Sequence, residues 1–489
     1  MRISLASVFL PLLGLQAASS HSVPTFEPRA EIEKAKIKTY SIPDGVDTSD
    51  AFKVKVRAPG GKWHDISTYR PRVVQTDIFT GSTAKKNSSM AYFDFSGSVE
   101  VSATYKNGQV TEARVRPNSF GIATKISKDT VKFTLNQPEN VVLQINDEIF
   151  DVLHLFSNPI EDNAPSSDDP NVVYYGPGLH KSSESLTVTS GQTIYLAGGA
   201  VVSVPAINIE NATDVTIRGR GMFSATLSTA ISIIGSKHIT LDGVIGINVL
   251  PRSYESSDVT IRNFRAFSSV QWGDGIDIYC SKNVLIDGVF MRNSDDCLAL
   301  YNHRDSWYGD NSNITVQNSA LWADVAHPIN VGTHGNTQNP ETTDGVIIRN
   351  IDILDHHEKQ IDYQGCIAIN PGDSNLIQNV VIDDVRVEDF RLGQLLNLRV
   401  TFNEKYNTSP GRGIRNVTIK NLVYDGTHAA TSVIAGYDED RTIDGITFQN
   451  LTVNGLAIND NMKKPGWYRT TDYVPMYIGP HVHNVTLQL

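Results

Sequence analysis

A short strand motif that recurs along the C-terminal half of the chain constrains its fold more than any other feature. Each copy has two apolar residues flanking a third residue. A polar residue follows and then, in all but the last copy, Gly, Asn or Asp, as in Val215-Thr-Ile-Arg-Gly. The ten copies begin at Val215, Ile239, Val259, Val284, Ile314, Val346, Val380, Val417, Ile446 and Val485. Consecutive copies lie between 20 and 39 residues apart, which is typical of a solenoid.

This repeat predicts a right-handed parallel β-helix. Because alternate side chains of a strand point to opposite faces, the two apolar residues of each copy face inward and the residue between them faces outward. The Gly, Asn or Asp begins a turn, and equivalent strands then stack about 4.8 Å apart around a Val, Ile and Leu core. The competing solenoid, a leucine-rich repeat, lacks its leucine–asparagine consensus here. Unequal steps place the insertions in loops, where a binding groove can form.

The preceding part of the chain has a different pattern. From Phe52 to Pro159, apolar and polar residues alternate in short runs separated by turn signals, among them the hairpin dipeptide Asn107-Gly108. Such runs predict an antiparallel β-sandwich, which we interpret as a supporting or carbohydrate-facing module. A polar stretch over 161–171 separates the two patterns. We therefore expect an N-terminal β-sandwich domain over 21–165 and a parallel β-helix domain over 166–489.

The first twenty residues have the layout of a secretory signal peptide. Arg2 precedes an apolar run from Leu5 to Leu15, and small residues follow up to Ser20. Nothing else approaches the ~20 apolar residues of a membrane span, so we expect a secreted, extracellular protein. Seven N-x-S/T sequons agree with export as N-glycosylation acceptors: Asn87, Asn211, Asn313, Asn407, Asn416, Asn450 and Asn484.

Charge and cysteine content exclude several kinds of partner. The 42 basic and 53 acidic residues give a net charge of −11, and no run of five Lys or Arg occurs, which excludes nucleic acid and anionic membranes. Cys280, Cys297 and Cys366 are too few for a disulfide framework and leave at least one thiol free. Their spacing does not fit zinc. We expect a monomer with no metal ion and no cofactor.

Carboxylates are concentrated in two neighbouring coils of the predicted β-helix, in the segments Trp272-Gly-Asp274-Gly-Ile-Asp277 and Asn293-Ser-Asp295-Asp296-Cys297. Asp274 and Asp295 are 21 residues apart, close to the shortest step, so Asp274 should meet Asp295 and Asp296 on one face. Hydrolysis of a glycosidic bond needs a protonated carboxyl to protonate the leaving oxygen and a carboxylate to activate water. Crowded carboxylates raise one another's pKa. A calcium site or a solvated Asp-rich turn is the alternative.

Together with His327-Pro-Ile-Asn-Val-Gly332, the two segments resemble the polygalacturonase family, glycoside hydrolase family 28. Its motifs N-T-D-G-F-D, N-Q-D-D-C and G-H-G-L-S-I-G occur in the same order. The architecture also resembles the dextranase and isopullulanase family, family 49, in which a β-sandwich precedes the β-helix. The specific motifs span about Trp272 to Asn370, whereas the likeness in organisation covers the whole mature chain. The resemblance implies a secreted glycoside hydrolase whose partner is a polysaccharide substrate.

The resemblance also implies the catalytic roles. Asp295 would be the general acid, and Asp274 and Asp296 would hold and deprotonate the water. Both families invert the anomeric centre, which implies carboxyls roughly 6.5–9.5 Å apart with room for water.

Other residues of the motifs receive secondary roles. His327 would tune the acid, or else be a structural histidine in the turn before Pro328. Asn293 would assist or bind substrate. We expect Asp277 to point into a turn or to hydrogen-bond the backbone.

The departures from the family concern the substrate. The R-I-K motif of polygalacturonases, whose cations hold the galacturonate carboxylate, corresponds here to Ala368-Ile-Asn370. A carboxylate docked there would be unpaired, which is costly in a cleft. The aromatic residues around the site suit stacking on uncharged sugar rings; they are Trp272, Tyr301, Trp307, Tyr308, Trp322 and Tyr363, of which we expect about half to touch sugar. By resemblance, the substrate is then a neutral α-glucan of the dextran or pullulan type.

Three alternatives remain open. The first is a pectin-directed hydrolase whose cations come from elsewhere, for example Arg304 or Arg399. The second is a non-catalytic β-helix that binds glycans. The third is a polysaccharide lyase, although the site lacks the Lys or Arg base that a lyase needs.

Overall fold

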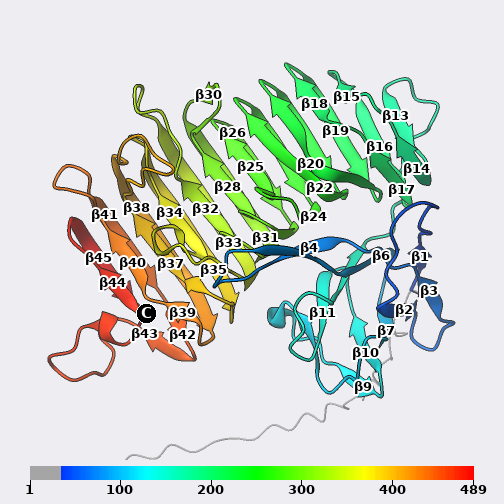
Figure 1. Ribbon diagram of the computed structural model, residues 1–489, viewed down its shortest axis with the longest axis horizontal. Helices are drawn as coiled ribbons and strands as arrows, with labels where there is room; N and C mark the ends of the chain where they lie inside the picture. The colour runs from blue at the N-terminus through cyan, green and yellow to red at the C-terminus, as the bar shows by residue number, and fades with distance from the viewer. Residues whose placement is uncertain (1–34) are drawn as a thin grey trace, which may run out of the picture. The chain divides into compact units, whose positions relative to one another are not determined.

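A computed structural model describes residues 35–489, and within them nearly all regular structure is β (Figure 1). Two five-stranded sheets form the N-terminal part, in the orders β1-β6-β12-β11-β8 and β3-β2-β7-β10-β9. Every neighbouring pair is antiparallel except β6 and β12, which run parallel. The first sheet comprises β1 (Ile37–Thr39), β6 (Ser89–Phe95), β12 (Leu153–Asn158), β11 (Asn140–Ile145) and β8 (Ala113–Arg116). The second comprises β3 (His64–Ile66), β2 (Phe52–Arg57), β7 (Val99–Tyr105), β10 (Thr130–Leu135) and β9 (Lys125–Ser127).

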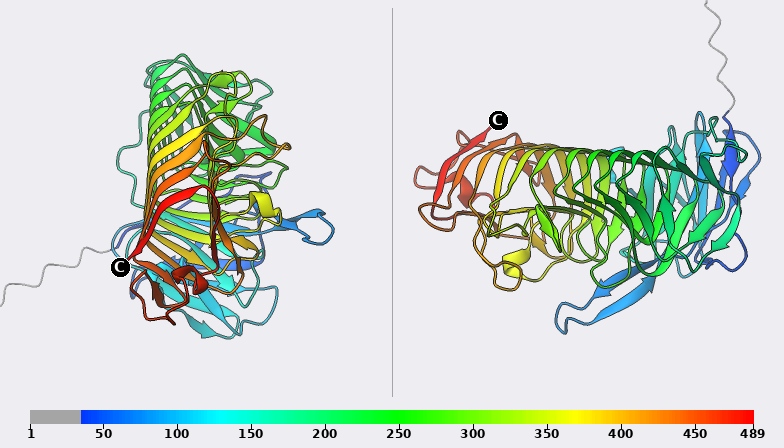
Figure 2. Two further views of the ribbon diagram at one scale, coloured as in Figure 1. Left: turned by 90° about the vertical axis from the view of Figure 1, so that its left-hand side faces the viewer. Right: turned by 90° about the horizontal axis from the view of Figure 1, so that it is seen from above.

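The predicted N-terminal β-sandwich is thus confirmed. The domain boundary at residue 165 stays a prediction, and the predicted signal peptide lies outside the described residues. A hairpin of β4 (Arg72–Thr76) and β5 (Thr83–Asn87) leaves the sandwich and extends beside the middle coils (Figures 1 and 2).

The remaining chain winds into a β-helix whose strands form three parallel sheets, which we name the repeat, flank and site sheets. The repeat sheet holds β13 (Val172–Tyr175), β16 (Thr193–Leu196), β19 (Thr213–Gly219), β21 (Lys237–Asp242), β23 (Ser257–Arg262), β26 (Lys282–Asp287), β41 (Ile443–Gln449) and β45 (Val482–Gln488). It also holds the first halves of β31 (Asn311–Ala323), β33 (Thr342–Asp355), β35 (Leu376–Glu388) and β38 (Gly413–Asp425).

The other two sheets follow around each coil. The flank sheet holds β14 (Gly178–Lys181), β17 (Ala200–Ser203), β24 (Arg265–Phe267), β27 (Phe290–Asn293) and β42 (Leu451–Val453), the first halves of β20 (Met222–Ile234) and β22 (Ile245–Tyr254), and the second halves of β31, β33, β35 and β38. The site sheet holds the second halves of β20 and β22 together with β15 (Leu186–Val188), β18 (Ile207–Glu210), β25 (Ile276–Tyr279), β28 (Leu298–Tyr301), β32 (Ile329–Gly332), β34 (Ile367–Asn370), β37 (Leu396–Arg399), β40 (Ser432–Ala435) and β44 (Met476–Ile478).

Short elements complete the described chain. They are β29 (His303–Arg304), β30 (Trp307–Tyr308), β36 (Gly393–Gln394), β39 (Ala429–Ala430), β43 (Leu456–Ile458) and the 3₁₀ turns η1 (Asn118–Phe120), η2 (Ile361–Tyr363) and η3 (Thr470–Asp472). Within residues 35–489, no helix is long and apolar enough to cross a membrane.

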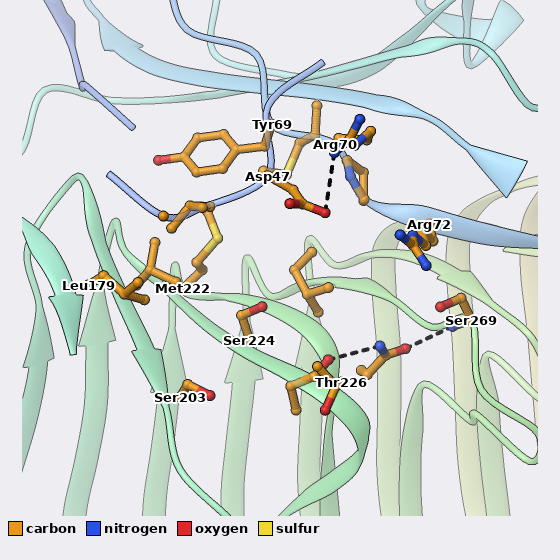
Figure 3. A pocket seen from close by; sticks show the side chains of 18 of the residues that line it. Asp47, Tyr69, Arg70, Arg72, Leu179, Ser203, Met222, Ser224, Thr226 and Ser269 are labelled. Atoms are coloured by element: carbon orange, nitrogen blue, oxygen red, sulfur yellow. Dashed lines mark hydrogen bonds and ion pairs between the residues drawn. The ribbon is translucent and has the colours of Figure 1, made fainter. Parts of the chain in front are cut away.

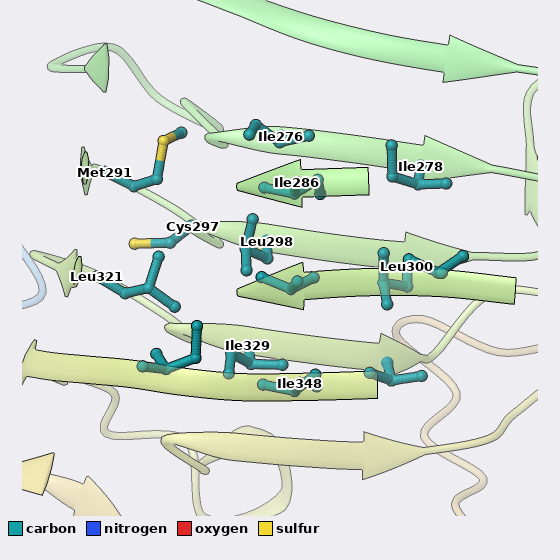
Figure 4. Close-up of a cluster of buried hydrophobic side chains, with 14 of the residues drawn as sticks. Ile276, Ile278, Ile286, Met291, Cys297, Leu298, Leu300, Leu321, Ile329 and Ile348 are labelled. Carbon is teal, nitrogen blue, oxygen red and sulfur yellow. The ribbon is translucent and has the colours of Figure 1, made fainter. Parts of the chain in front are cut away.

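The register of the repeat sheet confirms the sequence repeat residue by residue. The first residue of each predicted copy pairs with the first residue of the next, from Val215 with Ile239 through to Ile446 with Val485. The side chains of both apolar positions point inward and stack in columns. Figure 4 shows part of this core, in which Ile276, Leu298 and Ile329 of the site sheet face Ile286 and Ile348 of the repeat sheet. All three cysteines are buried and free.

The sandwich packs against the flank sheet, and this contact corrects one prediction. Trp322 is fully buried there, with the guanidinium carbons of Arg292 and Arg116 lying 4.0 and 4.5 Å from its ring centroid. Arg116 also pairs with Glu388 across the interface at 2.7 Å. The prediction that Trp322 lines the sugar site is therefore wrong, because the side that it faces is covered by protein.

The turns that follow the site sheet explain most of the sequons. Asn211, Asn313, Asn416 and Asn484 lie in these turns, whereas Asn450 lies in the turn between the repeat strand β41 and the flank strand β42; all five have left-handed backbone conformations with φ between 51° and 55°. Asn tolerates this conformation better than most residues, and the strand that follows begins with an apolar residue and Thr. A turn Asn followed by such a strand reads as a sequon. Glycosylation of these five exposed residues and of exposed Asn87 stays a prediction.

The turn asparagines also form hydrogen-bonded ladders along the helix axis. The Asn416 amide donates to Asn379 Oδ1 at 2.7 Å, and the Asn379 amide donates to Asp344 Oδ1 at 2.7 Å. Asn407 differs from the other sequons because it lies in a loop, and its buried amide donates to the Thr333 carbonyl. The folded structure contradicts an accessible glycosylation acceptor at Asn407.

Candidate active site

The three predicted catalytic aspartates meet at the corner where the flank sheet turns into the site sheet. Asp274 precedes β25, and Asp295 and Asp296 lie between β27 and β28. One carboxylate oxygen from each lies within 4.8 Å of the others. The pairing of Ile276 with Leu298 gives an offset of 22 residues, so Asp296 rather than Asp295 lies one coil beyond Asp274. The expected juxtaposition is confirmed, but the expected step of 21 is wrong by one residue.

The three aspartates approach one another closely enough to share a water. The 4.8 Å bound joins one oxygen of each side chain and does not measure the separation of whole carboxyl groups, so the expected 6.5–9.5 Å stays a prediction. Two hydrogen bonds of 2.8 Å that meet at one water at a tetrahedral angle span about 4.6 Å. The corner can therefore hold a single water between two carboxylates.

Glycine is required in this corner. A Cβ on Gly275 would collide with the Cys297 carbonyl, and one on Gly273 would come within 2.5 Å of Ser294 Oγ. The two glycines on either side of Asp274 let its coil approach the next coil closely.

Asp296 is buried and accepts four hydrogen bonds. Its Oδ1 accepts from the backbone N–H of His327 at 3.1 Å and from the ring Nδ1 at 2.6 Å. Its Oδ2 accepts from the Tyr301 hydroxyl at 2.7 Å and from the Asn330 amide at 2.8 Å. Burial alone would raise the pKa, but the His327 charge and these hydrogen bonds outweigh it and lower the pKa of Asp296. This carboxylate stays ionised.

Asp295 and Asp274 have the opposite tendency. Burial, and then the neighbouring charge of Asp296, raises the pKa of Asp295 well above its ordinary value. Burial, and then the charges of Asp277 and Asp295, raises the pKa of Asp274 in the same way. Adjacent residues of one turn are thus driven toward opposite protonation states.

Asp277 corrects another prediction. Its buried side chain does not enter a turn or bind the backbone but pairs with Arg252 Nε at 3.0 Å and accepts from the Tyr279 hydroxyl at 2.8 Å. Arg252 pairs with Asp277 in register, one coil before it, and its Nη2 lies 3.8 Å from Asp274. Sequence reasoning missed Arg252, although a one-coil offset from Asp277 could have identified it.

Asn293 and His327 support the aspartates from behind. The Asn293 amide donates to the Asp274 carbonyl at 2.9 Å and to Ser268 Oγ at 3.1 Å, so it orders the backbone of the loop before β25. His327 is buried, and because an ionised carboxylate only accepts, its Nδ1 carries the proton shared with Asp296. Asn330, three residues after His327 in the same motif, was not singled out from the sequence.

The predicted aromatic residues divide into three groups. Trp272 is 64% exposed beside Asp274, and Tyr308 is 52% exposed, so both are open to a ligand. Tyr301 and Tyr363 are held at the aspartates, the first by its bond to Asp296 and the second by an edge-to-face contact of 4.3 Å with His327. Trp307 packs on Tyr254 with centroids 5.9 Å apart.

The position of the family's cations is filled by uncharged residues. Ala368 is fully buried in register between Asn330 and Asn397, and the buried Asn370 donates to Asn397 Oδ1 at 3.2 Å.

The alternative cations lie elsewhere. The pKa of the exposed Arg304 is raised. Burial lowers this pKa, but the negative charges of Tyr279 and Asp305, followed by those of Tyr301 and Asp274, outweigh the effect of burial. Arg304 is thus linked electrostatically to the corner. Arg399 is paired with Asp362 at 3.3 Å.

The three clustered carboxylates are also the one group of His, Cys, Asp or Glu ligands within residues 35–489 that is close enough to hold a metal ion. Ca²⁺ takes 6–8 oxygen ligands, so water would have to supply most of them here.

Comparisons with known proteins agree with this geometry. No protein-family model matches the chain. Endopolygalacturonase B of Aspergillus niger is 24% identical over 194 residues, which are 39% of this chain and 49% of that protein. A polygalacturonase of Fusarium fujikuroi is 23% identical over 228 residues, which are 46% of this chain and 54% of that protein. The aligned segments thus cover about half of each relative.

Among solved structures, Dex49A from Penicillium minioluteum has a TM-score of 0.56 at 13% identity and covers 92% of this chain and 96% of its own. At this identity the likeness shows the fold. Sequence and fold together confirm that the chain resembles the β-helix glycoside hydrolases of the polygalacturonase (family 28) and dextranase–isopullulanase (family 49) clan.

Proposed function

We propose that the chain is a glycoside hydrolase that cleaves a polysaccharide with inversion of the anomeric centre. The observation that carries this proposal is the convergence of Asp274, Asp295 and Asp296 at one corner, where Asp296 accepts four hydrogen bonds; the pKa of Asp296 is lowered and that of Asp295 beside it is raised. Opposite shifts in neighbouring carboxyls are what an acid and a base of one reaction require.

Asp295 donates its proton to the leaving glycosidic oxygen. A water held between Asp274 and Asp296 loses a proton to a carboxylate as it attacks the anomeric carbon from the other side of the ring. Arg252, Asn293, His327 and Asn330 hold these groups in place.

The first candidate substrate is a neutral α-glucan of the dextran or pullulan type. Ala368 and Asn370 offer no charge to a sugar carboxylate, and Trp272 and Tyr308 offer exposed rings for stacking. We also propose export, directed by residues 1–20.

The second candidate is a pectin-directed hydrolase. The names of the relatives favour it, and the positive charge of Arg304 interacts electrostatically with Asp274.

A panel of dextran, pullulan, polygalacturonate, inulin and arabinan, with products read by mass and by reducing ends, tests both candidates. Cleavage of a neutral polymer that does not change with salt supports the first. Cleavage of polygalacturonate that weakens as salt rises supports the second, because salt screens exposed charges over about 8–10 Å. No release of sugar from any polymer would contradict hydrolysis and favour a glycan-binding β-helix.

A further inference from the structure

A cavity of about 400 Å³ lies between the sandwich side of the molecule and the early coils of the β-helix, outside the candidate active site (Figure 3). Arg70, Arg72 and Lys85 line it from the hairpin and the segment before it. Lys181, Asn248 and Ser269 line it from the β-helix. In Figure 3 the Arg72 side chain extends from the hairpin toward the coil that carries Ser269.

The cavity concentrates positive charge in a chain whose net charge is −11. Asp47 is its one acidic lining residue, and it pairs with Arg70 at 3.5 Å. In the part of the chain that the structure describes, no carboxylate pairs with Arg72, Lys85 or Lys181. The Nε of Arg70 is also buried without a hydrogen-bond partner. A bound anion would pair with these cations and could satisfy the unpaired donor.

The cavity lies in line with the catalytic corner. Ile247 pairs with Phe267 and Phe267 pairs with Arg292, so the turns that follow these strands stack coil on coil. Ser269 and Asn248 therefore stand about one and two coils before Asp295, and Asn248 Oδ1 accepts the Ser269 N–H at 2.8 Å. At about 4.8 Å per coil, the cavity begins within roughly 10 Å of the acid.

The hairpin connects the two places. Its base lines the cavity, and at its tip the Lys359 ammonium donates to the Ile78 carbonyl and lies 5.9 Å from the Phe79 ring centroid. Lys359 lies in the segment between β33 and β34 that also carries Tyr363, which contacts His327.

We propose that the cavity is a remote subsite for an acidic sugar of the same polymer that Asp295 cuts, and that Arg72 and Lys85 bind its carboxylate. This inference rests on the proposed function and favours its second candidate, the pectin-directed hydrolase, over the neutral α-glucan. With Ala368 and Asn370 at the cut, the polymer has an uncharged sugar there and free carboxylates a few sugars away, as in a partly esterified uronan.

Binding of trigalacturonate to the Asp295→Asn variant, measured by calorimetry at two salt concentrations, tests the subsite without turnover. Combining Asp295→Asn with Arg72→Gln and Lys85→Gln should weaken this binding at least tenfold and remove its salt dependence. The matched control is Lys86→Gln, because Lys86 is exposed on the same strand but does not line the cavity. Thermal unfolding of each variant checks that it is folded.

Isomaltotriose and inorganic sulfate are the comparison ligands. The subsite proposal is overturned if the Arg72 and Lys85 replacements leave trigalacturonate binding unchanged, if isomaltotriose binds equally tightly, or if sulfate binds as tightly as trigalacturonate. Hydrolysis by the unmodified enzyme is scored separately, on partly methyl-esterified polygalacturonate. Its absence would contradict the proposed function while leaving the binding result intact.

Discussion

Two corners of the same coils use Asn and Asp in opposite ways. At the corner before the repeat sheet, like residues stack on like residues, so that Asn416, Asn379 and Asp344 satisfy one another in a ladder. At the corner before the site sheet, Asp274 lies near Asp296, and the negative charges of the three carboxylates repel one another. The first corner follows the repeat and stabilises the fold. The second departs from the repeat, and this departure carries the chemistry that we propose.

The largest expected effect comes from the site corner. Asp295→Asn and Asp296→Asn should each lower kcat by at least about a hundredfold, the low end for general acid–base groups. Initial rates on the best polymer of the panel measure this. Near-normal turnover in either variant would contradict the catalytic role proposed for that aspartate.

The same two variants should differ in stability. A carboxyl whose pKa is raised in the fold favours folding below its unfolded pKa and loses that contribution as the pH rises through the folded pKa. The neutral side chain of Asp295→Asn does not ionise, so the variant avoids this loss of stability and should unfold at the same or a higher temperature at pH 7. Asp296→Asn turns an amide toward donors that the carboxylate satisfied, so its unfolding temperature should fall. Equal unfolding temperatures would contradict the pKa contrast.

Trp322 and Trp272 sharpen the comparison between packing and site. Trp322→Ala should cost about 3–5 kcal/mol of unfolding free energy, because it empties the interface between sandwich and flank sheet. Trp272→Ala should leave unfolding unchanged and raise KM. Denaturant titration and steady-state kinetics separate the two. A Trp322→Ala variant of normal stability would show that the interface does not hold the sandwich.

The pH profile probes the charge on His327. Activity should fall as the pH rises through the raised pKa of Asp295, and fall on the acid side where Asp296 becomes protonated below its ordinary value. His327→Gln removes the charge that lowers the pKa of Asp296, so the acid limb should move up by about one pH unit or more. Tyr406→Phe, which alters a ring stacked on Tyr363 without touching an aspartate, is the control. An unmoved acid limb would assign His327 a purely structural role.

The ladder corner should give a smaller effect that leaves catalysis intact. Asn379→Ala removes two exposed hydrogen bonds and puts Ala at φ 57°, and we expect it to cost about 1–2 kcal/mol with kcat unchanged. Asn379→Gly relieves the backbone and should recover part of the loss. Full recovery would mean that the ladder itself contributes nothing.

The smallest effect is expected from chelation. Neither the acid nor the base needs a cation, so EDTA should leave the rate unchanged. A loss that calcium restores would instead assign the carboxylate cluster to metal binding.

The sequence predicted the parts of this molecule that repeat. Each apolar pair such as Val380 and Ile382 recurs at a constant place in its coil, so its pairing partners follow from alignment of the copies. The same reasoning brought Asp274 to Asp295 and Asp296, and it erred by one residue because the loop before β28 is not part of the repeat.

The remainder depends on contacts that no periodicity encodes. The face covered by the sandwich decides that Trp322 is buried, and nothing near Trp322 in the sequence reveals that face. Asp277 has an ordinary strand position, and its role depends on Arg252 in the preceding coil. The cavity depends on the position of the hairpin, which the spacing of Arg72 and Lys85 in the sequence does not predict.

The constant register of the repeat sheet has a consequence for how such a chain diversifies. From β26 onward the steps lengthen to between 29 and 39 residues, yet every first apolar residue still meets its partner. The extra residues lie in the connections on either side of the site sheet, such as 302–310, 333–341 and 400–412 after it and 356–366 before it. Insertions and deletions there can remodel the walls around a substrate while selection on the core remains undisturbed, so specificity in this architecture can evolve by loop length alone.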